Sequence, residues 1–358
     1  MRTEHAPQGK PLEEILLAAT LLTAVVAVWA LPGCETAKPT VATGPGPVAV
    51  RPVTRTPLEP TQPTEAEAAL IDAAIAVAEV GDYEQALANF RELLAENPTL
   101  TEAHLGMATV LEKSGDLDRA ERSFARAATL ERDNFDAQSG HGRVLMALNR
   151  YNDAVRAWHK ALVVRPESVE ANIGMAMAFL GLDQPQTALG FAERAVRNDP
   201  QSGPARLELA RTYERLGRID EAIRTYEIAL ELNEPDDVIL GSLVKLFCTA
   251  KRYAEAANAS EELVKIAPSP NAYERLGWAR FRLGEYEKSM AAYRKGVELD
   301  PNHWPSLNGV GTNAMNKWLT SGKKDDDSRI EARRSFQKSI KVNPDQPKVI
   351  AILTQYRP

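Results

Sequence analysis

Alanine recurs in this chain at a fixed interval of 34 residues. The positions are Ala86, Ala120, Ala154, Ala188, Ala222 and Ala256. The next two members of the series are Ser289, one residue early, and Ala332, nine residues late. A period of this length over most of a chain predicts a repeat array and argues against a single globular core. Because such arrays mainly present surface, the pattern favours a binding scaffold.

The segment 101–134 indicates how one repeat folds. A first helix is expected over Thr101–Ser114 and a second over Leu117–Glu131, with Gly115 between them. Glycine suits that place because it enters the left-handed backbone region without steric cost. The equivalent positions elsewhere hold Gly81, Asn149, Gly217 and Gly284. Proline, which cannot donate a backbone hydrogen bond, closes the second helix. It does so at Pro98, Pro166, Pro200, Pro268, Pro301 and Pro344.

Small residues at two places in each repeat predict close helix packing. One place is the alanine series, and the other lies in the first helix. The first-helix positions are Ala74, Ala108, Gly142, Ala176, Ala210, Gly277 and Gly311, with Val244 as the exception. A bulky residue four positions after the alanine should fill the layer between neighbouring units. These residues are Phe90, Phe124, Trp158, Tyr226, Tyr293 and Phe336. Ala192 and Ser260 break the series, so the fourth and sixth units are expected to be the softest.

These positions together resemble the tetratricopeptide repeat, a 34-residue helix-turn-helix module, over about residues 67–344. The resemblance implies an all-α fold, an α-solenoid superhelix of about eight units with a C-terminal capping helix. First helices would line a concave groove that binds a peptide or a partner's helix. The expected units are about 67–100, 101–134, 135–168, 169–202, 203–236, 237–269, 270–303 and 304–345. Relatives that bind chaperone tails use a clamp of lysines and asparagines, which none of these units reproduces.

The eighth unit departs from the pattern. Its first helix is expected over Trp304–Trp318, followed by a polar insertion over Leu319–Ser328 before the second helix resumes near Arg329. Asp325, Asp326 and Asp327 lack the glycine and distal glutamate of a calcium loop. Residues 346–358 are expected to form a cap, because an open array end needs cover for its last apolar face.

The N-terminal residues 1–34 are expected to be a signal or membrane-anchor segment. Residues 15–31, ILLAATLLTAVVAVWAL, carry no charge, at the short limit of the ~17–25 residues that span a bilayer. Leu31-Pro32-Gly33-Cys34 follows and resembles a bacterial lipobox, which would make Cys34 the site of lipidation. Three interpretations stay open: a cleaved lipoprotein signal, an uncleaved membrane anchor, or ordinary secretion or a chance apolar run. The first two place the array in the bacterial cell envelope, membrane-anchored and outside the cytoplasm.

Residues 35–64 are rich in proline and threonine and are expected to be a disordered linker. Proline favours extended polyproline geometry, so this stretch is either a spacer that holds the array off the membrane or a leader of unselected length. The array itself would cover residues 65–345.

The bulk composition argues against several functions. The formal charge is -6 and the estimated pI is 5.6, whereas nucleic-acid binding relies on a basic footprint. No catalytic, cofactor or metal motif is recognised. His141 lies between two glycines on a first helix and is expected to be a packed side chain. Cys248 is expected to be a small buried hydrophobe. The chain is therefore predicted not to be an enzyme.

The residue after each small first-helix position is expected to face the groove, as is the residue one turn later. Positive charge gathers at these places in the third to seventh units. The predicted partner-binding residues are Arg143, Arg211, Arg215, Lys245, Trp278 and Arg282. Arginine forks favour carboxylates, and Trp278 would add an apolar anchor. The partner would then be a protein or peptide with an acidic segment or a free C-terminus. Alternatively, these cations only pair with neighbouring carboxylates such as Glu208, Glu214 and Glu274.

The function predicted from the sequence is a membrane-tethered scaffold that recruits a protein partner. Two alternatives remain: an assembly factor of an envelope machine such as a pilus, secretion or outer-membrane complex, and a regulatory subunit of a separate enzyme.

Overall fold

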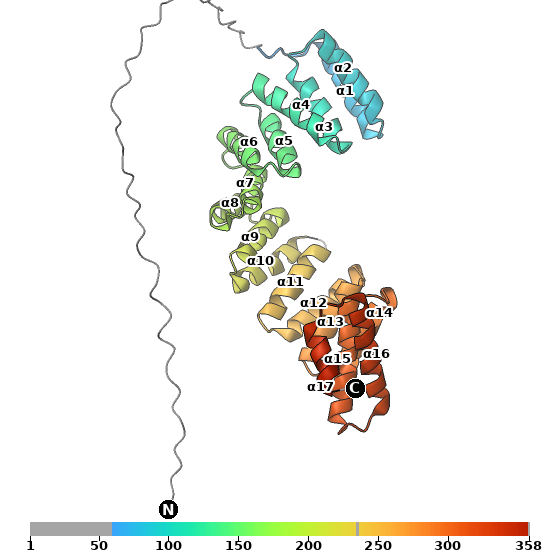
Figure 1. Cartoon of the computed structure of the whole chain (residues 1–358). Coiled ribbons are helices and arrows are strands. Elements are labelled where there is room, and N and C mark those ends of the chain that lie inside the picture. Colours follow the sequence, from blue (N-terminus) through green and yellow to red (C-terminus); the bar gives the residue numbers. More distant parts are fainter. Residues whose placement is uncertain (1–58, 234–235, 357–358) are drawn as a thin grey trace, which may run out of the picture. The chain divides into compact units, whose positions relative to one another are not determined.

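The computed structural model describes residues 59–233 and 236–356, and within them the chain forms seventeen helices (Figure 1). The helices of the first four units are α1 (Glu65–Glu79), α2 (Tyr83–Glu96), α3 (Thr101–Lys113), α4 (Leu117–Leu130), α5 (Phe135–Ala147), α6 (Tyr151–Val164), α7 (Val169–Gly181) and α8 (Pro185–Asn198). The remaining helices are α9 (Gly203–Arg215), α10 (Ile219–Leu232), α11 (Asp237–Thr249), α12 (Tyr253–Ile266), α13 (Pro270–Arg282), α14 (Tyr286–Leu299), α15 (Trp304–Thr320), α16 (Asp326–Val342) and α17 (Pro347–Tyr356).

Successive helices pack as hairpins, and each hairpin packs on the next one. The pairs α1–α2 to α15–α16 correspond to the eight predicted units, and α17 follows as an additional helix packed on α16. First helices also contact first helices of adjoining units, as α1 does α3 and α3 does α5. The only β pairing in the described residues is an isolated bridge between Thr61 and Leu100. The predicted all-α solenoid is therefore confirmed.

The turn inside each hairpin depends on one residue in the left-handed region. Gly81, Gly115, Gly217 and Gly284 have φ between 71° and 88°, and Asn149 has φ 57°, as the sequence predicts. The fourth and sixth units have no glycine or asparagine there, yet Asp183 and Lys251 adopt φ 57° and 60°. The hairpin geometry thus imposes this conformation even on residues for which it is unfavourable.

The core consists of aromatic rings held between small residues of two units. The alanines of the 34-residue series, with Ser289 and Ala332, are fully buried. Trp158 packs against Gly142 of its own unit and Gly174 of the next unit, where added Cβ atoms would lie 2.7 and 2.2 Å from the ring. Phe124 meets Gly140, and Tyr293 meets Gly309, in the same way. The small residues are therefore required because the rings occupy the space that side chains would need.

The fourth unit has no ring at this position, and its neighbour compensates. Ala192 and Ser260 are both fully buried at the positions where other units hold the aromatic side chain. In the fifth unit, Glu208 stands at the register of Gly140 and Gly174 and is buried. A long side chain thus replaces a glycine where the preceding unit lacks its ring. The relative softness of the fourth and sixth units stays a prediction.

The predicted insertion in the eighth unit is wrong in length. Helix α15 continues to Thr320 and α16 begins at Asp326, so that only 321–325 separate them. The carboxylate of Asp325 accepts a hydrogen bond from the backbone N–H of Ser328 at 3.0 Å and caps α16. Asp326 and Asp327 lie in the first helical turn, where negative charge is favoured by the helix dipole. The acidic run therefore starts a helix.

The array begins earlier than the predicted linker boundary at residue 64. The backbone N–H of Thr61 donates to the carbonyl of Thr99 at 3.3 Å, and its hydroxyl donates to Asn97 at 3.0 Å. Thr64 then caps α1 in a reciprocal box with Glu67. Residues 59–64 are thus attached to the end of the first unit.

The lipobox-like segment with Cys34, the apolar run 15–31 and the linker up to residue 58 lie outside the described residues. The expectations for them stay predictions. Among the residues that the structure does describe, every helix is too short or too polar to cross a bilayer.

Candidate partner-binding groove

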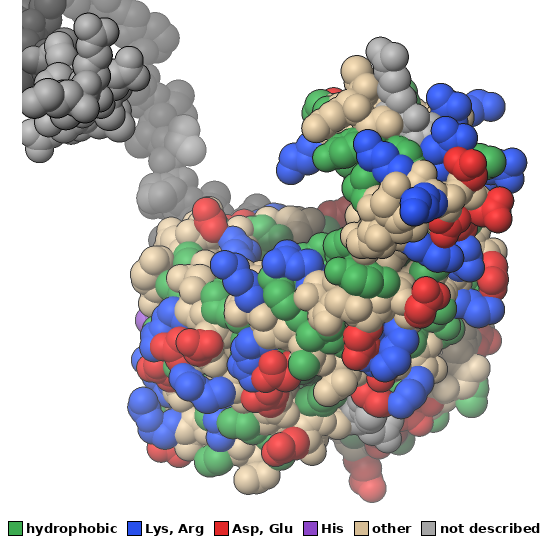
Figure 2. Space-filling view, turned by 90° about the horizontal axis from the view of Figure 1, so that it is seen from below, with side chains coloured by type: hydrophobic (Ala, Val, Ile, Leu, Met, Phe, Trp, Pro, Cys, Tyr) green, Lys and Arg blue, Asp and Glu red, His purple; other side chains and the backbone are tan. Residues whose placement is uncertain are grey.

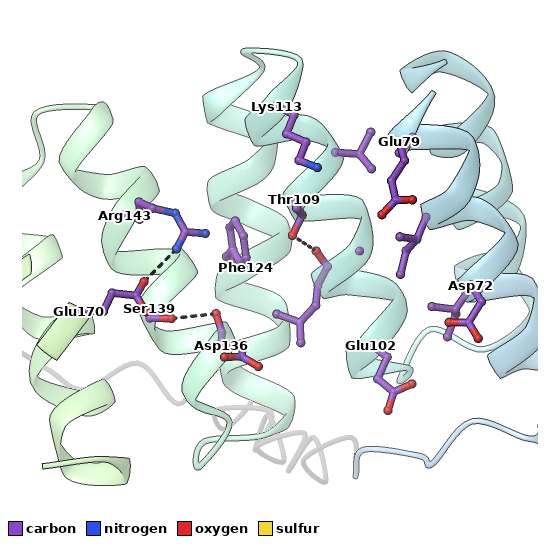
Figure 3. A pocket seen from close by; sticks show the side chains of 16 residues that line it. Asp72, Glu79, Glu102, Thr109, Lys113, Phe124, Asp136, Ser139, Arg143 and Glu170 are labelled. Carbon is purple, nitrogen blue, oxygen red and sulfur yellow. Dashed lines mark hydrogen bonds and ion pairs between the residues drawn. The ribbon is translucent and has the colours of Figure 1, made fainter. Parts of the chain in front are cut away.

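A hollow of about 560 Å³ lies against the first helices of the first four units, and we call it the acidic hollow (Figure 3). Its lining comes from α1, α3, α5 and α7, with the Phe124 ring contributed by α4. The residues are Ile71, Asp72, Ile75, Ala78, Glu79, Glu102, Leu105, Gly106, Thr109, Val110, Lys113, Phe124, Asp136, Ser139, Arg143 and Glu170. First helices thus line a concave surface, as the resemblance implies.

Carboxylates outnumber cations in this hollow. Asp72, Glu79, Glu102, Asp136 and Glu170 line it, against Lys113 and Arg143. Figure 3 places Glu102, Asp136 and Glu170 along one edge, while Lys113 and Glu79 lie at the opposite edge. Except for Glu170, none of these acids forms an ion pair with a residue in the described part of the chain. Their charge therefore faces the hollow unneutralised.

Arg143, a predicted binding residue, lies at one end of the acidic hollow. Its Nε donates to Glu112 at 2.8 Å and its Nη1 donates to Glu170 at 3.1 Å. The hydrogen bonds to Glu112 are the main reason that the pKa of Arg143 stands above its ordinary value. Because its guanidinium joins α3, α5 and α7, Arg143 links three units and offers little free positive charge.

Three other predicted cations lie outside both hollows, and carboxylates of the array pair with each. Arg215 Nη2 lies 2.6 Å from Asp183, and Lys245 Nζ lies 2.8 Å from Glu214. Arg211 Nη1 lies 3.7 Å from Glu208. The face shown in Figure 2 likewise carries interspersed acidic and basic side chains. The alternative that these cations pair internally therefore describes Arg211 and Lys245 with the predicted partners Glu208 and Glu214, but Glu274 has no such role here.

A second hollow of about 430 Å³, which we call the aromatic hollow, lies at the last two units. It is lined by residues of α13 and α15, together with Tyr293 of α14. The residues are Glu274, Trp278, Phe281, Arg282, Tyr293, Trp304, Pro305, Asn308, Gly309 and Thr312. The predicted residues Trp278 and Arg282 are thus brought together in one place, with Phe281 beside them.

Aromatic rings position Arg282. Its guanidinium carbon lies 4.5 Å from the centroid of the Tyr253 ring and 5.4 Å from that of Trp278. The two rings contact each other edge to face at 5.4 Å. Within the described residues, Arg282 has no ion pair, which distinguishes it from Arg143, Arg211, Arg215 and Lys245. Burial raises the pKa of the nearby Glu274 carboxyl, which weakens its competition for a cation.

The two residues examined for reactivity are packed side chains. His141 Nε2 lies 3.2 Å from Glu121, and burial is the main cause that lowers the pKa of its ring. Burial also raises the pKa of the Cys248 thiol to about 11, so that the thiolate nucleophile is scarce near neutral pH. The absence of catalysis stays a prediction.

The acids of the acidic hollow were missed because only cations were sought on the groove face. Yet Glu102, Asp136 and Glu170 are spaced by the same 34 residues as the alanines. Each is the second residue of a first helix. A search of every register position for a repeated charge of either sign finds this row from sequence.

The comparisons with known proteins agree with this architecture. Family models described as tetratricopeptide repeat match residues 77–144 and 179–244, residues 139–203, and residues 270–303. Heat shock protein STI1 of Saccharomyces cerevisiae is 32% identical over 93 residues, which are 25% of this chain and only 16% of that protein.

Two solved structures show a similar fold. The structure of PilW, a type IV pilus biogenesis factor, has a TM-score of 0.53 and 23% identity, and covers 57% of this chain and 94% of its own. The structure of Pseudomonas aeruginosa pilF has a TM-score of 0.51 and 20% identity, with 57% and 93% covered. At these identities, the likeness is one of fold. Together with the family matches over more than half of the sequence, the hairpin geometry establishes that the chain belongs to the tetratricopeptide repeat family.

Proposed function

We propose that this protein is a membrane-tethered scaffold that captures an acidic segment or a free C-terminal carboxylate of a partner protein in the aromatic hollow. Tetratricopeptide repeats form protein-interaction scaffolds, which gives the general function. The specific proposal rests on one observation: Arg282 is stacked on Tyr253 and Trp278 and has no carboxylate partner in the described part of the array.

This geometry suits an anion flanked by an apolar side chain. Stacking on two rings restrains the guanidinium without using its N–H donors, so that they stay available for a carboxylate. A volume of about 430 Å³ is sufficient for a large side chain. Trp278, Phe281 and Trp304 would anchor that side chain, since buried aromatic contacts dominate many protein interfaces.

The same reasoning narrows the set of predicted residues. Arg143, Arg215 and Lys245 lie within 3.1 Å of carboxylates of the array itself. Recruiting one of them would break an existing ion pair, which reduces the net gain. Capture of an acidic partner is therefore assigned to Arg282, while the paired cations are assigned to joining neighbouring units.

The proposal is tested with a short fluorescein-labelled peptide of aspartate, glutamate and one phenylalanine that ends in a free carboxylate. Arg282→Gln should weaken its binding about tenfold, whereas the matched variant Arg91→Gln, exposed on α2 and outside both hollows, should not. An amidated peptide distinguishes C-terminal capture from recognition of acidic side chains. Equal binding by both variants contradicts the proposal.

The membrane tether is proposed from the lipobox-like sequence that ends at Cys34. Mass spectrometry of the mature N-terminus distinguishes its fates. A lipidated Cys34 supports a lipoprotein, an intact residue 1 supports an uncleaved anchor, and release into solution after Cys34→Ala supports the lipid as the anchor. An envelope location would fit an assembly factor as well, and the pilus proteins share the fold. Crosslinking in intact cells should then recover one dominant machine.

A further inference from the structure

We propose that the acidic hollow is a second binding site, for a cationic amphipathic segment of a partner protein. Such a segment would place lysine or arginine side chains on either side of an aliphatic or aromatic one. The site is separate from the aromatic hollow, because the two share no lining residue. It adds a ligand of opposite charge to the function proposed above.

The charge of the hollow is directed and uneven. Glu102, Asp136 and Glu170 form a row contributed by three consecutive first helices, and Asp72 and Glu79 add charge from α1. Arg143 takes up Glu170 alone among the five. A concave surface between low-dielectric walls focuses such a field and draws in a cationic partner.

The row is not a requirement of the repeat. A carboxylate in the first turn stabilises a helix through its dipole, and this effect applies to Glu102, Asp136 and Glu170. Later units, however, form the same helix with Pro204, Val238, Asn271 and Pro305 at these positions. The acids are therefore confined to the units that line the hollow, as expected for a site of recognition.

The floor of the hollow is apolar and partly open. Val110 and Phe124 are buried beneath it, whereas Ile75 of α1 keeps 40% of its surface exposed. An exposed isoleucine flanked by carboxylates suits a ligand that carries an apolar side chain between cations. A purely polar polycation would leave this surface in water.

The spacing of the acids favours a peptide over a metal ion. In the part of the chain that the structure describes, no group of three or more His, Cys, Asp or Glu side chains converges closely enough to hold a metal. The carboxylates come from four helices and lie at both edges of the hollow (Figure 3). Several cations along one extended ligand can each reach a different acid.

The site is tested on the full chain with a labelled peptide that repeats lysine and leucine in an amphipathic order. The test variant is Asp72→Asn/Glu102→Gln/Asp136→Asn, and the matched control is Glu84→Gln/Glu92→Gln/Asp118→Asn, which removes the same charge from exposed positions of α2 and α4. The test variant should bind at least about tenfold more weakly, with the control within about twofold of the unaltered protein. Circular dichroism confirms that both variants keep their helices.

Two further peptides separate recognition from general charge attraction. Replacing leucine by serine in the probe should weaken binding about tenfold, as should Ile75→Ser in the protein. Equal binding of the leucine and serine probes, or equal losses in the test and control variants, overturns the proposal. Arg282→Gln should leave lysine–leucine binding unchanged, so that failure at the acidic hollow is distinguishable from failure at the aromatic one.

Discussion

The acidic hollow and the aromatic hollow lie on the same side of the same kind of helix and differ only in their lining. Ile75 in α1 and Trp278 in α13 occupy equivalent places, one after the small residue at Ala74 and Gly277. Around the first, unpaired carboxylates surround an aliphatic floor. Around the second, rings surround one unpaired arginine. The repeat therefore sets where the groove lies, and a few lining residues set what it attracts.

Between these two regions the groove is electrically balanced. Lys245 pairs with Glu214 and Arg215 with Asp183, each across a boundary between units. Charges that are paired in this way join neighbouring units, and charges that remain unpaired at the two hollows are available to partners. This contrast can be broken or sharpened by four measurements.

The largest effect is expected from Trp278→Ala. Removing a central aromatic anchor should weaken binding of the acidic peptide about a hundredfold or more, and leave the lysine–leucine peptide unaffected. Fluorescence anisotropy with both peptides measures the difference. A parallel loss of both affinities would show that the hollows are not independent.

Glu208 lies between the two regions and gives a pH dependence. Burial raises the pKa of its carboxyl to about 7, although Arg211 opposes this. In the unfolded chain the pKa is near 4.5, so that the native state binds the proton more tightly. Stability from this group is complete below pH 4.5 and is lost as the pH rises through 7.

Glu208→Gln should therefore stabilise the protein by up to about 3 kcal/mol at pH 8, with little change at pH 4. Urea unfolding of both proteins across this range measures the difference. A difference that does not vary with pH would mean that the native carboxyl titrates as in the unfolded chain.

The third measurement concerns the packing layer that both regions share. Ala154 is fully buried in α6, so that Ala154→Leu should overpack a close helix contact and cost ~1–3 kcal/mol. The melting temperature should fall while both peptides still bind the folded protein at low temperature. An unchanged melting temperature would contradict the assigned register.

The smallest effect is expected at the hairpin turn of the sixth unit. Lys251 has φ 60°, which costs an L-residue more than it costs glycine. Lys251→Gly should raise the free energy of unfolding by about 1 kcal/mol. Gly217→Lys, the reverse change in the fifth unit, should lower it by a similar amount, and chemical denaturation measures both.

Sequence predicted the helices closely because their signals are local. The expected Thr101–Ser114 and Leu117–Glu131 differ from α3 and α4 by one residue at the C-terminal end. The insertion of the eighth unit was wrong because an acidic run was interpreted as loop, although Asp325 is a helix cap. Trp278, Phe281 and Arg282 were placed on the groove correctly, whereas the row of Glu102, Asp136 and Glu170 was overlooked.

The order of the hairpins, their turns and the buried alanines follow from the sequence by itself. A period of 34 residues and the needs of close helix packing act within one unit and repeat. Which charges are free was decided only by the tertiary structure. Arg143 meets Glu112 from 31 residues away, and Arg215 meets Asp183 from 32. These partners belong to adjoining units, so that only the stacking of whole hairpins brings their side chains within reach.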